Sequence, residues 1–188
     1  MACLLHHSFE SAELPFERYT MKIVMLNAAT LPVYRDELAR LLIEASKQGI
    51  TAGLPPTFEQ QEAENVFHDL RPAISHNELL LWIARDEQGV TGTVLLNLVR
   101  SQESSHHAEV SALLVCSRVR RSGVGRLLLR ESEIKAQVLR YTMLSSDMQS
   151  GTAAEAFYRS QGYRCAQCKT STDYRRRNEV VYYKQLQP

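Results

Sequence analysis

The stretch that most constrains the fold of this chain is Arg-Arg-Ser-Gly-Val-Gly-Arg, residues 120–126. An apolar run, Leu113-Leu114-Val115, precedes it, and a leucine-rich segment with helical spacing begins at Val124. The stretch therefore predicts a strand, a glycine turn and a helix in direct succession. Backbone N–H groups at a helix start are unpaired and carry the positive end of the helix dipole, and glycine lets an anion approach them closely. The turn is therefore a candidate phosphate site.

Two well-known phosphate-binding motifs do not fit this turn. A Walker P-loop requires Lys-Ser or Lys-Thr after its second glycine, and here Arg126 and Leu127 follow Gly125. A dinucleotide fingerprint requires a third glycine, and that position is Leu128. Taken alone, the turn would be a plain strand-to-helix connection that uses glycine for its backbone angles.

Composition bounds the class of protein. A chain of 188 residues with 44% hydrophobic and 23% charged residues is expected to form one globular domain with a sizeable core. The formal net charge of +1 argues against a nucleic-acid-binding surface over the whole molecule. The sequence shows no apolar run near the ~20 residues that span a bilayer, and no signal peptide. The four cysteines are too irregular for a disulfide framework, so a reducing cytoplasm is expected. Cys165 and Cys168 form a C-x-x-C without a second ligand pair nearby, so no metal site is expected.

Hydrophobic periodicity and the glycine and proline positions predict the element order βααβββαβαββ, an α/β (α+β) plan on a mixed, mostly antiparallel sheet flanked by helices. Thr57 is the expected N-cap of the second helix. Residues 1–20 are an expected N-terminal extension, poorly ordered, and residues 21–188 a single domain. The expected elements are strand 21–27, helices 31–49 and 57–74, hairpin 79–99, strand 108–116, helix 124–139, strand 141–147, helix 152–161, and strands 163–170 and 179–186.

The pattern R-x-x-G-x-G at 120–125, followed by a helix, a strand and Ala-Glu-Ala-Phe-Tyr at 154–158, resembles the GNAT superfamily of acyl-CoA-dependent N-acetyltransferases. The resemblance covers residues 21–186, because the element order also agrees, and implies a GNAT-like fold. Within the superfamily the chain is most similar to the tabtoxin-resistance type, in the shared features Leu-Leu-Leu-Trp in the first hairpin strand, Ala-Glu-Val opening the long strand, an aspartate ending the next strand, and Ala-Glu-Ala-Phe-Tyr. Two positions depart from the family pattern: Ser117 replaces a common proline and Arg121 a frequent glycine.

The resemblance implies acetyl-CoA as the acetyl donor. In the family the glycine turn binds the pyrophosphate of coenzyme A, the preceding strand pairs with the pantetheine arm, and a tyrosine of the later helix lies near the thiol. The cofactor-binding residues that this implies are Leu113, Leu114, Val115, Arg120, Arg121, Ser122, Gly123, Val124, Gly125, Arg126, Ala154 and Tyr158.

Three residues are candidates for the chemistry. Amide formation needs a neutral amine, so a base must accept a proton. Glu109 stands in an apolar strand and is expected to share a face with Ser111, Leu113 and Val115; the alternative is a solvated edge residue. Asp147 is expected to end the adjacent strand and to look into the same cleft, with an N-cap or loop-start role as the alternative.

The resemblance gives Tyr158 the role of proton donor to the leaving thiolate. The alternative is a core aromatic. Of the adjacent aromatics, Phe157 is expected to be the buried one. The resemblance also implies that backbone N–H groups near Leu113 and Val115 stabilise the oxyanion.

The sequence therefore predicts acetyl transfer to a primary amine of a small molecule or amino acid, including a toxin or antibiotic, by direct attack in a ternary complex. The alternatives are a protein or aminoacyl-tRNA N-acetyltransferase and a non-catalytic acyl-CoA-binding module. The loop at 49–56 is a candidate for acceptor specificity. The basic run Tyr-Arg-Arg-Arg-Asn at 174–178 is a solvated turn, or a site for an acidic substrate or RNA. Whether the chain forms a homodimer stays open.

Overall fold

The computed structural model describes residues 21–50, 52–98, 106–168 and 179–187. A seven-stranded sheet with the order β1-β2-β3-β4-β5-β7-β6 organises them. All neighbouring strands are antiparallel except β4 and β5, which are parallel. The elements are β1 (Lys22–Leu26), α1 (Leu31–Lys47), α2 (Gln60–Asp69), α3 (Arg71–Ser75), β2 (Leu79–Asp86), β3 (Gly89–Asn97), β4 (His107–Val115), a 3-10 turn η1 (Ser117–Val119), α4 (Val124–Val138), β5 (Met143–Gln149), α5 (Ala153–Ser160), β6 (Arg164–Cys168) and β7 (Glu179–Gln185).

This arrangement confirms the predicted fold class and, with one change, the predicted element order. The predicted extension at 1–20 and the basic run at 174–178 lie outside the described residues. Gly49 and Gly162, the predicted helix stops, adopt φ values of 73° and 87°, which a residue with a side chain rarely adopts.

The change concerns the helix predicted at 57–74, which the structure divides into α2 and α3 at Leu70. Pro72 explains the break, because proline has no N–H to donate and its ring clashes with the carbonyl four residues earlier. The predicted N-cap is also wrong: Glu59, in extended geometry, precedes α2. Thr57 lies buried further upstream, and its backbone N–H donates to Ser46 Oγ at 3.1 Å.

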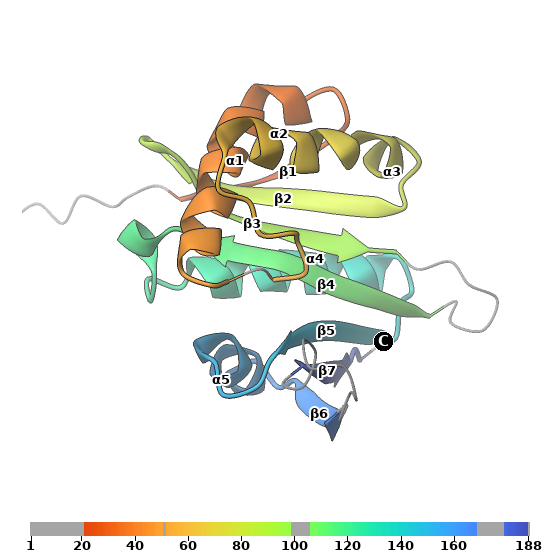
Figure 1. The fold of residues 1–188 in the computed structure, drawn as a ribbon. Helices are drawn as coiled ribbons and strands as arrows, with labels where there is room; N and C mark the ends of the chain where they lie inside the picture. Colours follow the sequence, from red (N-terminus) through yellow and green to blue (C-terminus); the bar gives the residue numbers. More distant parts are fainter. Residues whose placement is uncertain (1–20, 51, 99–105, 169–178, 188) are drawn as a thin grey trace, which may run out of the picture.

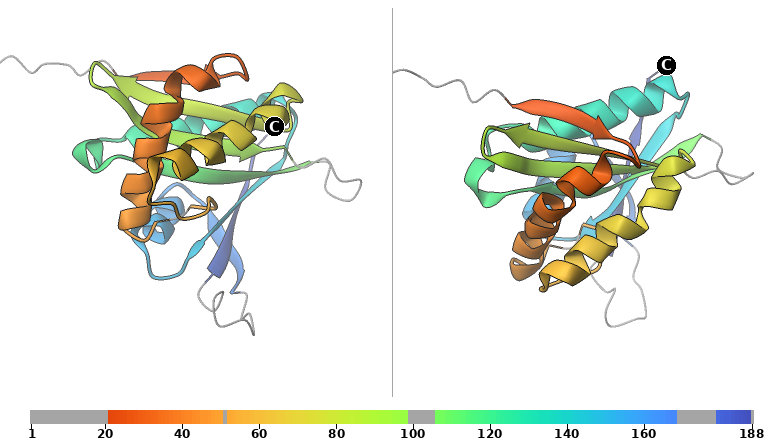
Figure 2. Two further views of the ribbon diagram at one scale, coloured as in Figure 1. Left: turned by 45° about the horizontal axis from the view of Figure 1, so that its top comes forward. Right: turned by 90° about the horizontal axis from the view of Figure 1, so that it is seen from above.

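The helices cover the two faces of the sheet unequally (Figures 1 and 2). Helices α1, α2 and α3 pack on one face of β1–β4 around Leu38, Leu42, Phe67 and Leu81. Helix α4 packs on the opposite face, and that core also takes in side chains of α5, β5 and β7. No helix of the described residues covers the β5–β7 part of the first face (Figure 1).

Strand β4 contains a bulge that changes which side chains share a face. Leu95 of β3 pairs with Ser111, yet Thr93 pairs with Leu114, so β4 has one more residue than β3 between these pairs. The backbone of Ala112 has a φ of 48° at this point. Side chains that alternate before the bulge therefore alternate in the opposite sense after it.

The burial pattern follows this inversion. Ala108 and Val110 belong to the core under α4, whereas Ala112 and Leu114 belong to the core under α1 and α2. Leu113 and Val115 pack against the α4 core. The prediction that Glu109 shares a face with Leu113 and Val115 is therefore wrong, and for Ser111 it is confirmed.

The packing of β3 against α4 leaves no room for a side chain at Gly92. A Cβ on Gly92 would lie 2.9 Å from the backbone oxygen of Leu114 and 3.0 Å from Leu128 Cδ1. We expect Gly92→Ala to lower the free energy of unfolding by about 1–3 kcal/mol, because the core must shift to admit the methyl group. Urea denaturation with an unchanged m-value measures the effect.

Gly125→Ala is the matched control, since its Cβ would meet the nearest side-chain atom at 3.6 Å, an ordinary contact. This variant should be at least as stable as the wild type, because alanine favours a helix by up to about 1 kcal/mol. Equal denaturation midpoints for Gly92→Ala and the wild type would contradict the close packing.

Candidate active site

The glycine turn places a set of unpaired backbone donors at the start of α4. Gly123 is the N-cap in left-handed geometry, with φ of 92°, and makes no side-chain cap. The N–H of Leu127 donates to the carbonyl of Gly123, which closes the first helical turn. Within the described ranges, the N–H groups of Val124, Gly125 and Arg126 have no protein acceptor. A Cβ built on Gly123 would meet nothing within 4 Å, so the space in front of these donors is open.

Two interactions that the sequence analysis missed hold this turn in place. Glu44 of α1 accepts hydrogen bonds from the Ser117 backbone N–H, at 2.7 Å, and from the Ser117 hydroxyl. Burial raises the pKa of Glu44, but these hydrogen bonds and the charge of Arg120 outweigh it, so the pKa lies below its usual value. Ser117 was the available signal, because a serine where a proline is common restores an N–H that needs an acceptor.

The second interaction joins Arg118 to Asp86 at the end of β2, through hydrogen bonds of 2.8 and 3.2 Å. The Asp86 side chain is only 1% exposed, and its pKa is lowered mainly by the Arg118 hydrogen bond. This ion pair anchors η1 to the β2–β3 hairpin. The turn is thus tied to two separate elements.

The backbone of β4 leaves its second edge open next to the turn. Strands β4 and β5 pair only from His107–Met143 to Glu109–Ser145, and beyond this point they separate (Figure 1). The Cys116 N–H donates to Thr91 of β3 at 2.8 Å. Because backbone groups alternate along a strand, the N–H groups of Leu113 and Val115 point away from β3, toward the separation. These are the predicted oxyanion and pantetheine donors.

The predicted cofactor-binding residues of this region differ in whether their side chains or only their backbone atoms can reach a ligand. Arg120 donates from Nε to the carbonyl of Val115 at 3.0 Å, and Ser122 Oγ donates to the Val119 carbonyl. Arg121, with φ of 63°, and Arg126 are exposed. The side chains of Leu114 and Val124 are buried, so only their backbone atoms can meet a ligand. The last predicted residue of this set, Ala154 on α5, is exposed.

Of the two aromatic residues of α5, Tyr158 is the buried one, whereas the sequence predicted Phe157. Tyr158 is buried, in edge-to-face contact with Phe157 and Tyr163 at 5.6 and 5.0 Å between ring centroids. Phe157 is only partly buried, and its ring lies 3.7 Å from the Cβ position of Gly125, beside the turn. The prediction that Phe157 is the buried residue is therefore wrong. Tyr158 is the α5 side chain that is buried in the core on the α4 side of the sheet. The Phe157 ring lies instead beside Gly125, at the start of α4.

Burial raises the pKa of Tyr158 to about 12, although a hydrogen bond with Ser146 opposes the shift. The charge of Glu133 adds to it. The phenol therefore keeps its proton throughout the neutral range. Its proposed catalytic role stays a prediction.

Glu109 and Asp147 lie on the same face of the sheet, the one without a covering helix at β5. Glu109 pairs with Ser145, and Asp147 follows two residues later along β5. Strand β5 continues to Gln149, so the prediction that Asp147 ends the strand is wrong. Burial raises the pKa of the half-buried Glu109, and the negative charge of Asp147 raises it further. The two carboxylates are thus close enough to interact.

Neutral polar groups surround Glu109 on this face, and the sequence analysis did not identify them. His107 Nε2 and Ser145 Oγ lie 2.8 Å apart, and Asn97 Nδ2 donates to Ser111 Oγ at 3.2 Å. The available signal was the period-two spacing of residues 107, 109 and 111, which places them on one face before the bulge.

The loop predicted to shape acceptor specificity packs directly against the bulge. The Ala112 N–H donates to the carbonyl of Ala52 at 2.6 Å, and a Cβ on Gly53 would lie 3.3 Å from Ser111 Cβ. Thr51 falls outside the described residues. The rest of the loop therefore lies next to the strand that carries Glu109.

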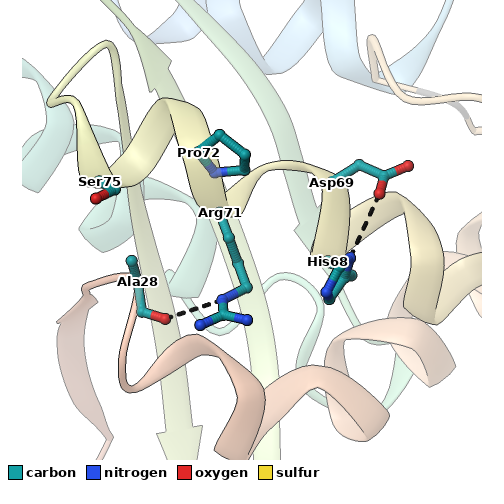
Figure 3. A pocket seen from close by; sticks show the side chains of 6 residues that line it. All are labelled: Ala28, His68, Asp69, Arg71, Pro72 and Ser75. Carbon is teal, nitrogen blue, oxygen red and sulfur yellow. Dashed lines mark hydrogen bonds and ion pairs between the residues drawn. The ribbon is translucent and has the colours of Figure 1, made fainter.

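A hollow of about 560 Å³ lies elsewhere, between the β1–α1 connection and the break between α2 and α3 (Figure 3). Arg71 Nε donates there to the Ala28 carbonyl at 3.1 Å, and His68 Nδ1 lies 3.4 Å from Asp69 Oδ1. None of the predicted site residues lines this hollow. We therefore place the candidate active site at the turn and the β4–β5 separation.

Within the part of the chain that the structure describes, no three His, Cys, Asp or Glu side chains are grouped so as to hold a metal ion. Cys165 is exposed. Among the same residues, no helix has the length and apolar character needed to cross a membrane.

The raised pKa of Glu109 makes a prediction about stability. A carboxyl group whose pKa is higher in the folded state binds more protons there than in the unfolded state, so stability falls as pH rises from the ordinary pKa near 4.5 through the raised value. We expect Glu109→Gln to raise the melting temperature at pH 7, because it removes this cost. The gain should disappear below pH ~4, where the unfolded carboxyl is also protonated.

Differential scanning calorimetry at both pH values measures the effect. Glu131→Gln, at an exposed position on α4, is the control and should change the melting temperature little at either pH. A Glu109→Gln variant that is equally or less stable than the wild type at pH 7 would contradict the prediction.

Comparisons with known proteins agree with this geometry. Residues 77–165 match the family described as acetyltransferase (GNAT) domain. A ribosomal-protein-alanine N-acetyltransferase from Brucella melitensis is 22% identical, with 88% of this chain and 99% of that chain covered and a TM-score of 0.66. The putative acetyltransferase yncA from Salmonella typhimurium, solved with its cofactor acetyl-CoA, is 16% identical over 89% and 94% with a TM-score of 0.68. The PaiA N-acetyltransferase from Thermoplasma acidophilum, in complex with coenzyme A, is 15% identical over 88% and 99% with a TM-score of 0.63.

The solved structures share the fold of this chain across most of its length, and the family match covers the hairpin, the long strand, the glycine turn, α4 and α5. Residues 77–165 therefore match a GNAT acetyltransferase domain, and the described chain has the GNAT fold.

Proposed function

We propose that this protein transfers the acetyl group of acetyl-CoA to a primary amine of a small molecule or amino acid, by direct attack within a ternary complex. The observation that carries the proposal is the N-terminus of α4, whose first N–H groups have no acceptor among the described residues, just after β4, from which β5 has separated. A proposed anion site and an open strand edge therefore lie side by side. A ligand with both a phosphate group and an amide-containing arm could bind to the two features at once.

The glycine turn fits the pyrophosphate part of coenzyme A. Three backbone N–H groups that have no acceptor among the described residues meet the positive end of the α4 dipole there. Arg121 and Arg126 are exposed on either side of the turn. The edge of β4 at Leu113 and Val115 offers backbone groups to the amides of the pantetheine arm. PaiA and yncA, which share the fold, were solved with coenzyme A and acetyl-CoA, respectively.

A carboxylate in the turn should abolish this binding. Gly123→Asp places a negative side chain in the open space before the α4 donors, and aspartate tolerates left-handed geometry better than most residues. We expect the affinity for acetyl-CoA to fall below detection in isothermal titration calorimetry, with the fold retained by circular dichroism.

Gly49→Asp is the matched control, since Gly49 has a similar φ of 73° and equally open surroundings at the end of α1. It should bind acetyl-CoA like the wild type. Unchanged affinity in a folded Gly123→Asp protein would exclude the turn as the coenzyme site.

Glu109 is the proposed base for the acceptor. The reacting amine attacks the thioester carbonyl carbon, and the proton that the amine loses passes to the Glu109 carboxylate, directly or through water. The raised pKa of Glu109 makes it a stronger base than an ordinary glutamate. The N–H groups of Leu113 and Val115 are the proposed donors to the oxygen that becomes negative during the attack. Asp147 and a water molecule remain the alternative bases.

Tyr158 is the proposed donor to the departing sulfur. Coenzyme A leaves as a thiolate whose conjugate acid has a pKa near that of cysteine, about 8.5. Because the pKa of Tyr158 is about 12, the phenol stabilises the thiolate through a hydrogen bond, and complete proton transfer to the sulfur is uphill. The thiolate takes its proton afterwards from solvent.

Tyr158→Phe removes the hydroxyl and keeps the ring that packs against Phe157 and Tyr163. We expect near-normal acetyl-CoA affinity and a turnover number lowered by roughly 10–10³-fold, at or below the usual range for acid catalysis. Single-turnover kinetics and thermal melting on the same preparation test this. A destabilised variant with the wild-type rate per folded molecule would make Tyr158 a purely structural residue.

The proposal leaves more than one class of acceptor. The similarity to the tabtoxin-resistance type rests on Leu-Leu-Leu-Trp in β2, Ala-Glu-Val in β4, Asp147 and Ala-Glu-Ala-Phe-Tyr at 154–158. A toxin or antibiotic amine is one small-molecule acceptor that this similarity suggests, and it does not establish that substrate. Acetylation of a protein or aminoacyl-tRNA is the alternative acceptor class. A non-catalytic acyl-CoA-binding module is the third option, and release of coenzyme A with any amine would exclude it.

A further inference from the structure

The hollow of about 560 Å³ beside the break between α2 and α3 (Figure 3) lies within the range of about 300–1,000 Å³ that is usual for small-molecule sites. Two separate parts of the chain line it: Ala28 from the β1–α1 connection, and His68, Asp69, Arg71, Pro72 and Ser75 from α2 and α3. No residue proposed for acetyl-CoA or for the acceptor contributes to this lining. A ligand bound here would therefore be additional to the two substrates of acetyl transfer.

Helices α2 and α3 bring three polar side chains of the lining to one face. His68, Arg71 and Ser75 are three and four residues apart, the spacing that places side chains on the same side of a helix. The break between the two helices leaves this face intact, because Leu70 at the junction keeps helical backbone angles. In Figure 3 the side chains of Arg71 and His68 extend in the same direction from the helices.

The guanidinium of Arg71 is oriented inside the hollow by a single contact. Arg71 is half-buried, and its Nε donates to the carbonyl of Ala28 at 3.1 Å. Among the described residues, its terminal nitrogens Nη1 and Nη2 make no hydrogen bond or ion pair. Removing water from a charged group is costly unless another partner replaces the water. The two terminal nitrogens are therefore donors that a ligand can satisfy.

The carboxylate that lines the hollow does not serve as this partner. Asp69 Oδ1 lies 3.4 Å from His68 Nδ1, and the Asp69 side chain points away from Arg71 in Figure 3. That side chain is 80% exposed, so water and salt screen its negative charge. The Arg118 guanidinium, by comparison, has the Asp86 carboxylate at 2.8 Å. Arg71 thus holds a cationic fork toward the hollow with a backbone carbonyl as its described acceptor.

We infer that this hollow binds a small organic molecule through a carboxylate or phosphate group, two of whose oxygens accept hydrogen bonds from Arg71. The planar guanidinium suits both groups, because its parallel N–H bonds meet two oxygens at once. An inorganic anion would fill only a small part of the hollow, so the ligand has a body that lies against the apolar ring of Pro72. His68 Nε2 and the Ser75 hydroxyl offer further polar contacts. The inference goes beyond the proposed function and does not depend on it.

Three probes with the same aromatic ring test the inference. Benzoate carries a carboxylate, phenyl phosphate carries a phosphate, and benzamide has the shape of benzoate without its charge. Each is titrated into the isotope-labelled full chain at constant ionic strength, and backbone amide shifts are followed by NMR. We expect one or both anions to give saturable shifts at Ala28, His68 and Arg71 at roughly millimolar concentrations, and benzamide to give none. The anion that binds more tightly identifies the group that the site prefers.

Two substitutions of Arg71 separate its charge from its fork. Arg71→Gln removes both, and we expect it to weaken anion binding by about tenfold or more, because hydrogen bonds to a charged group are lost. Arg71→Lys keeps the charge without the fork and should bind with intermediate affinity; it carries the test if Arg71→Gln does not fold. Arg130→Gln removes an exposed arginine on α4 and should keep the wild-type affinity. Thermal melting checks that each variant is folded.

The inference is overturned by the absence of shifts near the hollow with either anion, or by equal shifts with benzoate and benzamide. Wild-type anion affinity in folded Arg71→Gln and Arg71→Lys proteins also overturns it, and leaves Arg71 with its contact to Ala28 alone. Anion-dependent shifts confined to residues 123–127 would report the glycine turn. They would overturn the site in the hollow while supporting the proposed coenzyme site.

Discussion

One extra residue in β4, at Ala112, decides how the candidate active site is arranged. The bulge turns Glu109 and Ser111 toward the face of α1 and α2, and turns Leu113 and Val115 toward α4. The carboxylate proposed as base and the strand edge proposed for the coenzyme arm therefore belong to the same strand but serve opposite sides of the sheet. The Ala112 N–H, displaced from the β3 ladder by the bulge, is satisfied by the carbonyl of Ala52.

The end of the β4–β5 ladder completes this arrangement. Pairing stops after Glu109 and Ser145, so backbone groups of Leu113 and Val115 lack a neighbouring strand at the point where a thioester would be attacked. Unpaired backbone groups are costly when buried, and a bound ligand is one way to satisfy them. The separation thus connects the proposed coenzyme side of the sheet with the face that carries Glu109.

The glycine turn depends on contacts that lie outside it. In the described part of the chain, the N–H groups at the start of α4 have no acceptor, so the turn is held mainly by its neighbours. Asp86 and Glu44, from β2 and α1, supply the hydrogen bonds that hold Arg118 and Ser117 just before it. Charged groups on two other elements thus hold the proposed anion site in place.

Local signals in the sequence determined the element order, the stops at Gly49 and Gly162, and the strand–turn–helix at residues 113–126, because periodicity, glycine geometry and proline act over a few neighbouring residues. Pro72 is also a local signal, and it divides the helix predicted at 57–74 into two. The bulge at Ala112, the burial of Tyr158 in place of Phe157, and the partners Glu44 and Asp86 were decided only by the tertiary structure. Each depends on residues tens of positions away in the chain, whose contacts no local spacing encodes.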